Sequence, residues 1–142
     1  PISLPSKLID KSLRKEAFKM GKTVVVYEGG ESMRFDQNSI KDGIRGAKRI
    51  LGHDKMIDFE SEDRPSSLCK ESLWIRAKNS GLIRLSKRSG EKVEKKETIA
   101  VITDPFGNFK TNIKAPQSGI IIGHSNAPLV NQGDAIFHLG II

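Results

Sequence analysis

A carboxylate follows a short β-branched run in the first half of the chain. Residues 23–27 read Thr-Val-Val-Val-Tyr, and Glu28, Gly29 and Gly30 come directly after them. The run has the composition of a buried parallel strand, and side chains at the carboxyl ends of such strands open into the crevice where α/β folds bind ligands. A carboxylate there can take a proton from water and return it to a leaving amine. Glu28 also fits a simpler interpretation, as a surface side chain that ends a strand.

Residues that usually bind metals are few, and their spacing does not suit a ligand set. The three histidines are His53, His124 and His138, and none has a carboxylate or a second histidine at ligand spacing. The single cysteine, Cys69, excludes an internal disulfide and a cysteine-based metal site within one chain. We interpret His53, after a helix end, and His138, in a terminal strand, as structural. The sequence therefore predicts no metal site in this chain.

Helical patterns flank the β-branched run. Apolar residues recur at helical spacing at Leu8, Ile9, Leu13, Ala17 and Met20 before it, and at Ile40, Ile44, Ala47, Ile50 and Leu51 after it. Asp36, Asn38 or Ser39 is the expected cap of the second helix, which should end at Gly52. One strand between two helices cannot complete a sheet, so its backbone partners must come from missing residues or another chain. Residues 1–57 thus form the C-terminal segment of a larger α/β domain.

The rest of the chain carries strand signals only. The polar residues 58–69 are typical of a linker. Strands are expected at residues 73–77, 82–85, 98–103, 120–123 and 135–139. Two motifs recur: residues 80–83, Ser-Gly-Leu-Ile, resemble residues 118–121, and residues 93–99 resemble residues 130–136. The repeat predicts that residues 70–142 form two similar half-barrels packed about a pseudo-twofold axis.

The repeated half resembles the biotinyl/lipoyl barrel-sandwich hybrid domains. The matching segments are Gly81, Gly90-Glu91-Lys92-Val93, Ala115-Pro116-Gln117-Ser118-Gly119 and Val130-Asn131-Gln132-Gly133-Asp134. Lys96 departs from the pattern, which usually has glycine at this turn, as the second copy does. Carrier domains of this type hold their cofactor on a lysine at a hairpin tip, where this chain has Asn108. Because attachment needs a primary amine, we expect no carrier function, although Lys110 and Lys114 lie nearby.

A second resemblance covers nearly the whole chain. The hairpin Asp104-Pro105-Phe106-Gly107-Asn108 and the ending from Asn126 to Leu139 resemble the succinylglutamate desuccinylase/aspartoacylase family, as do Leu13-Arg14-Lys15-Glu16-Ala17, Glu28-Gly29-Gly30 and Arg49-Ile50-Leu51-Gly52. In that family a lipoyl-like barrel follows a carboxypeptidase-like domain. The resemblance implies a helix–strand–helix remnant of an α/β zinc-hydrolase domain over residues 1–57. An all-β barrel-sandwich hybrid domain over residues 70–142 would follow it.

The resemblance also implies roles for two side chains. Glu28 takes the place of the family's general base, and Arg14 matches an arginine that binds the substrate carboxylate through its guanidinium fork. Arg14 fits equally well as an exposed helical arginine. The family's zinc ligands, a His-x-x-Glu pair and a later histidine, lie upstream of the matched segment. Zinc is therefore expected in the full-length parent, with no ligand in this chain.

These expectations give two classes of function. The first is the C-terminal fragment of a zinc-dependent hydrolase that cleaves the amide bond of an N-acyl amino acid or related small molecule. The parent would act on non-peptide C–N bonds, and the 142-residue chain alone would be inactive. The alternative is a non-enzymatic barrel-sandwich interaction module related to biotinyl/lipoyl domains.

The charge raises a third class, which the residue pattern disfavours. The formal net charge is +7, but aromatic residues do not interleave with the basic ones as base stacking requires. We therefore expect a solvated basic surface and no nucleic-acid partner. No segment approaches the roughly 20 apolar residues that cross a membrane, and the first residues lack a signal-peptide pattern. The expected partner is a small acyl-amino-acid substrate in the cytoplasm, with a homo-oligomer left open.

Overall fold

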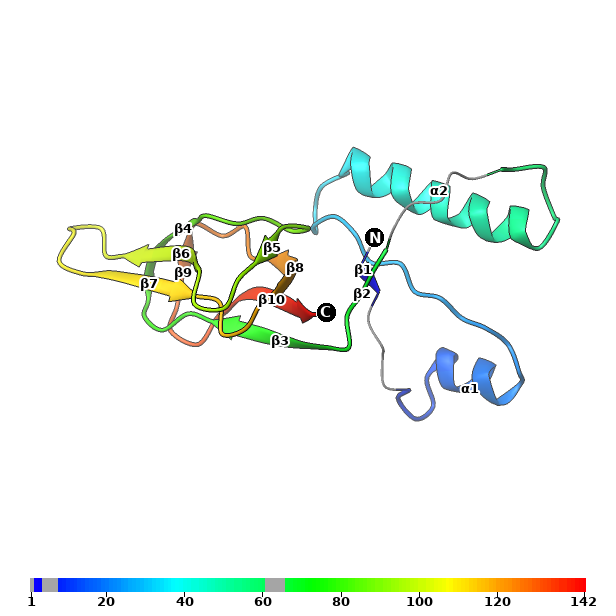
Figure 1. The fold of residues 1–142 in the computed structure, drawn as a ribbon, viewed down its shortest axis with the longest axis horizontal. Coiled ribbons are helices and arrows are strands. Elements are labelled where there is room, and N and C mark those ends of the chain that lie inside the picture. The colour runs from blue at the N-terminus through cyan, green and yellow to red at the C-terminus, as the bar shows by residue number, and fades with distance from the viewer. Residues whose placement is uncertain (1, 4–7, 61–65) are drawn as a thin grey trace. The chain divides into compact units, whose positions relative to one another are not determined.

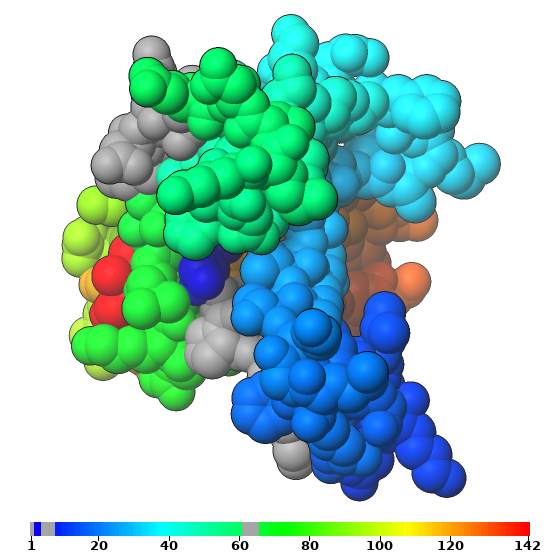
Figure 2. Space-filling model, turned by 90° about the vertical axis from the view of Figure 1, so that its right-hand side faces the viewer, coloured from blue at the N-terminus to red at the C-terminus, as the bar shows by residue number. Residues whose placement is uncertain are grey.

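The computed structural model of the chain describes residues 2–3, 8–60 and 66–142, which fall into two units (Figure 1). Residues 8–60 form the helical unit, with helices α1 and α2. Residues 2–3 and 66–142 form the strand unit, which contains every strand of the described residues. Figure 2 shows side chains of α1, in blue, and α2, in cyan to green, open at the surface, and neither helix has a buried residue.

Helix α1 spans Leu13–Lys19 and is shorter than the apolar pattern predicted. Ser12 has extended backbone, and its side chain accepts a hydrogen bond from the backbone nitrogen of Lys15 at 3.2 Å, which caps the helix. Just before it, Lys11 has a positive φ of 59°, a conformation that no α-helix continues through. Leu8 and Ile9, which were included in the apolar helical pattern, therefore lie outside the helix.

Helix α2 spans Gln37–His53, and Asp36 is its N-cap, one of the three residues predicted for that role. The Asp36 carboxylate accepts a hydrogen bond from the backbone nitrogen of Ser39 at 2.6 Å. The helix runs through Gly52, where we expected it to end. A Cβ at Gly52 would lie 2.6 Å from the carbonyl oxygen of Phe59, so this glycine serves a close backbone approach and not a helix stop.

The segment between the helices has no regular secondary structure, so the strand predicted at residues 23–27 was wrong. A strand exists only with a neighbour that completes its hydrogen bonds, and the described part of the helical unit contains no second strand. Val25 and Tyr27 are 73% and 57% exposed. The segment keeps the composition of a buried strand while lacking the partners that would bury it.

The strand unit contains two four-stranded antiparallel sheets. The first sheet has the order β3-β10-β8-β5 and the second has the order β7-β6-β4-β9. Their strands are β3 (Glu71–Arg76), β4 (Gly81–Leu85), β5 (Lys92–Val93), β6 (Thr98–Thr103), β7 (Lys110–Lys114), β8 (Gly119–His124), β9 (Leu129–Val130) and β10 (Ala135–Ile141). A separate parallel pair joins β1 (Ile2–Ser3) to β2 (Ser67–Leu68). All five strands expected after residue 70 are present.

The sequence repeat is also a repeat of strand pairing. Strands β3, β4, β5 and β6 correspond in order to β7, β8, β9 and β10, and replacing each by its equivalent converts the order of one sheet into that of the other. The register shift between Thr98 and Ala100 in β6 recurs between Ala135 and Phe137 in β10. Each sheet takes two strands from each repeat, so the two repeats are intertwined.

The two copies share a turn that is held by the same hydrogen bonds. In the first copy the backbone nitrogen of Lys95 donates to the Ser118 hydroxyl at 2.9 Å, and in the second that of Gln132 donates to Ser80 at 2.9 Å. Lys96 has a φ of 70°, close to the 92° of Gly133 at the equivalent position. The departure from glycine at Lys96 is thus accommodated without a change of backbone.

Apolar side chains from both sheets form one core. Its buried members are Ile75, Ala77, Val93, Ile99, Ala100, Ile102, Ile113, Ala115, Ile121, Val130, Ile136, Phe137 and Leu139. Strands β6 and β10 supply six of these residues, and the consecutive buried pairs Ile99–Ala100 and Ile136–Phe137 lie at the two register shifts. The described residues of the strand unit therefore have a hydrophobic core that the helices of the other unit lack.

Candidate functional site

Glu28 lies in the irregular segment of the helical unit, is exposed, and directly precedes Gly29 and Gly30. Gly30 has a φ of 80°, which side-chain-bearing residues adopt at a cost. A Cβ at Gly29 would lie 2.6 Å from the Tyr27 hydroxyl oxygen. The turn expected after Glu28 is therefore present: its backbone requires glycine at Gly30, and a side chain at Gly29 would have to displace the Tyr27 side chain.

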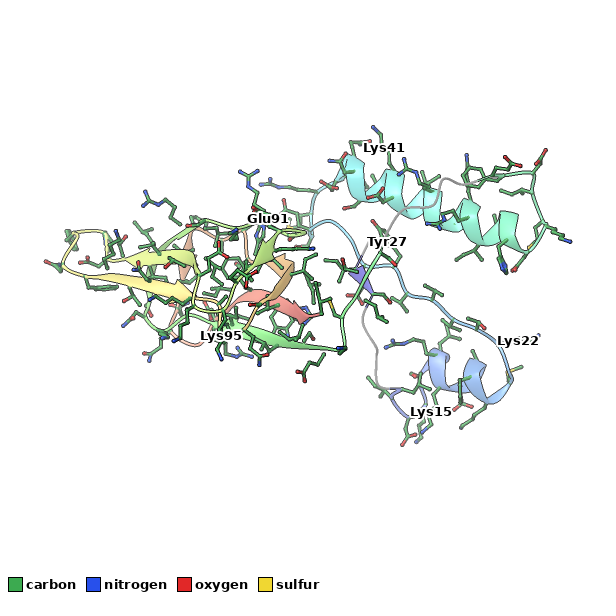
Figure 3. The ribbon with its side chains drawn as sticks, in the orientation of Figure 1. Lys15, Lys22, Tyr27, Lys41, Glu91 and Lys95 are labelled. Carbon is green, nitrogen blue, oxygen red and sulfur yellow. The ribbon has the colours of Figure 1, made fainter. Side chains whose placement is uncertain are left out.

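Tyr27 attaches this segment to α2 (Figure 3). Its hydroxyl donates a hydrogen bond to the backbone carbonyl oxygen of Ser39 at 2.8 Å. Its ring lies so near Gly43 that a Cβ there would be 3.0 Å from a ring carbon. These contacts fix the backbone on the N-terminal side of Glu28 relative to the helix.

A hollow of about 150 Å³ lies beside Glu28, between the segment and the start of α2. It is lined by Tyr27, Gly29, Gly30, Arg34, Phe35, Asp36, Ser39 and Ile40. The lining includes both chain neighbours of Glu28 but not Glu28 itself. The hollow offers mainly apolar surface, and Arg34 and Asp36 are its charged groups.

Two charged side chains at the hollow already have partners. Hydrogen bonds from the backbone and the hydroxyl of Ser39 hold the pKa of Asp36 below its ordinary value, so this carboxylate stays ionised as the helix cap. Arg34 lies 3.4 Å from the Glu31 carboxylate, and its side chain remains 77% exposed. Arg34 can therefore turn toward an anion at modest cost, since an exposed ion pair contributes little.

Arg14 occupies the first turn of α1 and is half-buried, whereas Glu28 belongs to the segment between the helices. No hydrogen bond or ion pair between these two residues is present in the described part of the chain. The structure places both in the helical unit without joining them.

The described residues do not fit a zinc site. Within residues 2–3, 8–60 and 66–142, no three histidine, cysteine, aspartate or glutamate side chains gather as a metal would require. Cys69 is buried, and burial raises the pKa of its thiol, which disfavours the thiolate that metals bind. His53 lies 3.0 Å from the Asp54 carboxylate beside it in the chain.

Side-chain hydrogen bonds close the hairpin between β6 and β7 at Asn108, the residue that the sequence resemblance aligned with the carrier lysine. Asn108 donates a hydrogen bond through Nδ2 to the Asp104 carboxylate at 2.6 Å. The same carboxylate accepts from the backbone nitrogen of Phe109 at 3.2 Å. Asn108 therefore supports the turn.

Sequence reasoning missed an aromatic pair on the strand unit. Trp74 and His138 stack with their ring centroids 4.2 Å apart and their planes within 8° of parallel. His138 had been interpreted only as part of a terminal strand. The signal that could have found the pair is the repeat itself, because the pairing of Val101 with Asn112 in the β6–β7 hairpin is equivalent to the pairing of His138 with Trp74 between β10 and β3.

No protein-family model matches the sequence, and no curated protein matches it either. Solved structures share its fold. The product-bound ectoine utilization protein EutE (DoeB) from Ruegeria pomeroyi matches 100% of this chain with a TM-score of 0.80 and 20% identity. A succinylglutamate desuccinylase from Silicibacter sp. TM1040 matches 99% with a TM-score of 0.78 and 21% identity. An aspartoacylase family protein from Mesorhizobium loti matches 100% with a TM-score of 0.65 and 14% identity.

The chain has a succinylglutamate desuccinylase/aspartoacylase fold. The match takes in both the helical and the strand unit, because it extends over all or nearly all of the chain. The chain spans only 45%, 44% and 44% of the lengths of these three proteins. In the described residues, neither helix of this desuccinylase-like chain has the length and apolar content to cross a membrane.

Proposed function

We propose that the chain is the C-terminal part of a zinc-dependent hydrolase that cleaves the amide bond of an N-acyl amino acid or a related small molecule. One observation carries the proposal: the entire chain, or nearly all of it, matches the fold of solved structures such as a succinylglutamate desuccinylase, but it covers less than half of the length of each. Glu28 fits the proposal as an exposed carboxylate directly before a glycine turn, and its neighbours Tyr27 and Gly29, but not Glu28 itself, line a small hollow.

In this proposal Glu28 is the general base. Its carboxylate takes a proton from the water that attacks the acyl carbon, and the proton passes to the nitrogen of the departing amino acid as the C–N bond breaks. Such a positioned carboxylate contributes about 10²–10⁴-fold to a rate. Arg14 is the proposed ligand of the substrate carboxylate, since a guanidinium pairs with a carboxylate through two parallel hydrogen bonds.

The metal would be held elsewhere in the parent protein. In this proposal the chain contributes the base and a substrate contact, and the zinc ligands come from the part of the parent protein that lies outside this chain. The strand unit is proposed to be a barrel-sandwich hybrid domain without a carrier lysine. The proposed location is the cytoplasm, in keeping with a single cysteine that cannot form an internal disulfide.

A second candidate function rests on the strand unit. Residues 66–142 include a core of their own, and the two sheets need nothing from the helical unit to complete their pairing. The alternative is therefore a non-enzymatic interaction module related to biotinyl/lipoyl domains. It would leave Glu28 without a catalytic role.

Substituting Glu28 in the full-length parent separates the two candidates. Glu28→Gln should lower turnover on N-acyl amino acids by about 10²–10⁴-fold while zinc content and thermal stability stay unchanged. Turnover on a panel of N-acyl amino acids and metal analysis are the measurements. The 142-residue chain alone should bind no stoichiometric zinc and show no turnover.

Glu60→Gln is the matched control, because Glu60 is another exposed carboxylate of the helical unit. It should leave the rate unchanged. If Glu28→Gln keeps near-normal turnover with zinc bound, Glu28 is not the base. A parent that hydrolyses no acyl-amino acid would favour the interaction module.

A further inference from the structure

On the outer face of each sheet, three paired residues form a row across neighbouring strands. The two rows have equivalent positions in the repeat but different residues. In the second sheet, Val101 of β6 lies opposite Asn112 of β7 on one side and Arg84 of β4 on the other. In the first sheet, the same pairing places His138 of β10 between Trp74 of β3 and Gly123 of β8. The residues that flank His138 along β10, Phe137 and Leu139, are buried, so His138 faces outward.

The row in the first sheet holds two parallel aromatic rings in a fixed orientation. Trp74 and His138 are stacked at 4.2 Å, and His138 Nε2 lies 2.8 Å from the Ser72 hydroxyl oxygen. Trp74 is 57% exposed, although large aromatic side chains are usually mostly buried. One face of the imidazole lies against the indole, and the other lies toward the strand that carries Gly123.

The position above Gly123 is open. A Cβ built on this glycine would have no atom within 4 Å, and its φ is not in the left-handed region, so the backbone does not require glycine. The first sheet also has a register shift that the equivalent β4–β6 pair lacks, between His138 and Leu139, which adds Ile122 to β8. Bulges commonly redirect side chains beside functional sites. The aromatic pair, the bulge and the open position at Gly123 therefore lie in the same row of the first sheet.

We propose that this row, formed by Trp74, His138 and Gly123, binds the guanidinium group of an arginine side chain presented by a protein partner. The equivalent row indicates the occupant, because Arg84 has there the register position that Gly123 has here. A planar guanidinium stacks on an aromatic face, whereas the compact ammonium of lysine does not. The bound arginine becomes the third member of the stack.

The two rings of the row are uncharged near neutral pH. Burial lowers the pKa of His138, which keeps the imidazole neutral near neutral pH. Arg76, the next outward-facing residue of β3 after Trp74, donates through Nη1 to the carbonyl oxygen of Gly133 at 2.8 Å and keeps its positive charge, so attraction of the guanidinium must come from stacking. An uncharged stack of two rings attracts a cation through the negative faces of the π systems.

Tryptophan fluorescence tests the site, because Trp74 is the only tryptophan of the chain. The probes are blocked tripeptides with arginine, lysine or phenylalanine between two glycines, added to the intact 142-residue chain. The arginine peptide should give a saturable change in fluorescence. The lysine peptide should bind about threefold or more weakly, as expected when stacking is lost.

Two variants make the result specific. Gly123→Arg places a guanidinium of the chain itself in the third position of the stack, so it should abolish binding of the arginine peptide. Thermal unfolding checks that this variant keeps its fold. His138→Val reproduces the Val101 row and should weaken binding by about threefold or more. The proposal is overturned if the arginine peptide gives no saturable change, if lysine or phenylalanine peptides bind as well, or if both variants bind normally.

Discussion

Lys96 has a backbone conformation that favours glycine, in a turn whose second copy contains Gly133. The left-handed region costs a residue with a Cβ about 1–2 kcal/mol. Replacement by glycine removes that cost but adds about 0.5–1 kcal/mol of chain entropy on folding. Lys96→Gly should therefore raise the free energy of unfolding by about 0.5–1 kcal/mol, measured by chemical denaturation.

Lys95→Gly is the control for this prediction, because Lys95 precedes Lys96 in the same turn without a positive φ. It should destabilise the protein, since glycine brings only the entropic penalty there. Equal effects of the two substitutions would contradict the conformational explanation.

His138 should make stability depend on pH. Burial lowers its pKa below the ordinary value of 6.5, so the unfolded chain binds a proton more readily than the folded chain. The neutral ring therefore contributes fully to the free energy of unfolding above pH 6.5. This contribution is lost as the pH falls through the lower pKa of the folded state. Denaturation midpoints of the wild type and His138→Gln, compared at several pH values, should converge as the pH falls through this window. A difference that does not vary with pH would refute the assignment.

At the scale of the element, the β6–β7 hairpin should accept neither biotin nor lipoate. Partial burial raises the pKa of Asp104, but hydrogen bonds from Phe109 and Asn108 outweigh it and hold the pKa below its ordinary value. The ionised carboxylate thus keeps the turn closed around an amide that cannot be acylated. Intact mass after expression with biotin and lipoate ligases should show no addition.

Lys110 and Lys114, the first and last residues of β7, are the only lysines of that strand. A mass increase mapped to either would contradict the prediction. Asn108→Lys supplies an amine at the hairpin position and shows whether the rest of the hairpin permits attachment.

Element prediction from sequence succeeded where local pattern decides structure. The runs at β6 and β10 have enough residues to show β-branched composition, and the cap at Asp36 has a local mechanism. The two-residue strands β5 and β9 are too short to show alternation and were missed. Residues 23–27 were assigned as a strand from composition, but strand formation depends on a neighbour that local sequence does not supply.

The candidate site was predictable only in part, for a similar reason. Glu28 and its two glycines are consecutive and carry their own signal. The contacts of Tyr27 with Ser39 and Gly43, and the stack of Trp74 on His138, join residues that are distant in sequence. Such contacts follow from the tertiary fold and leave no local pattern.

At the scale of the whole molecule, the two units should differ in stability. A polypeptide of residues 66–142 should unfold in one cooperative thermal transition, because it keeps the buried core and both complete sheets. A polypeptide of residues 8–60 should show no such transition, since neither helix buries a side chain. Calorimetry and circular dichroism are the measurements. A gradual, non-cooperative profile for residues 66–142 would contradict the prediction.

The exchange of strands between the repeats has a consequence for the ancestry of the strand unit. Each sheet draws two strands from each repeat, and the two sheets have equivalent strand orders. A short chain with one repeat could therefore build both sheets only by associating with an identical chain, as a symmetric dimer with exchanged strands. Duplication and fusion of its gene would turn that association into a single covalent chain. Later divergence of the two copies could then account for Trp74 and His138 in the row of the first sheet and Arg84 in the equivalent row of the second sheet.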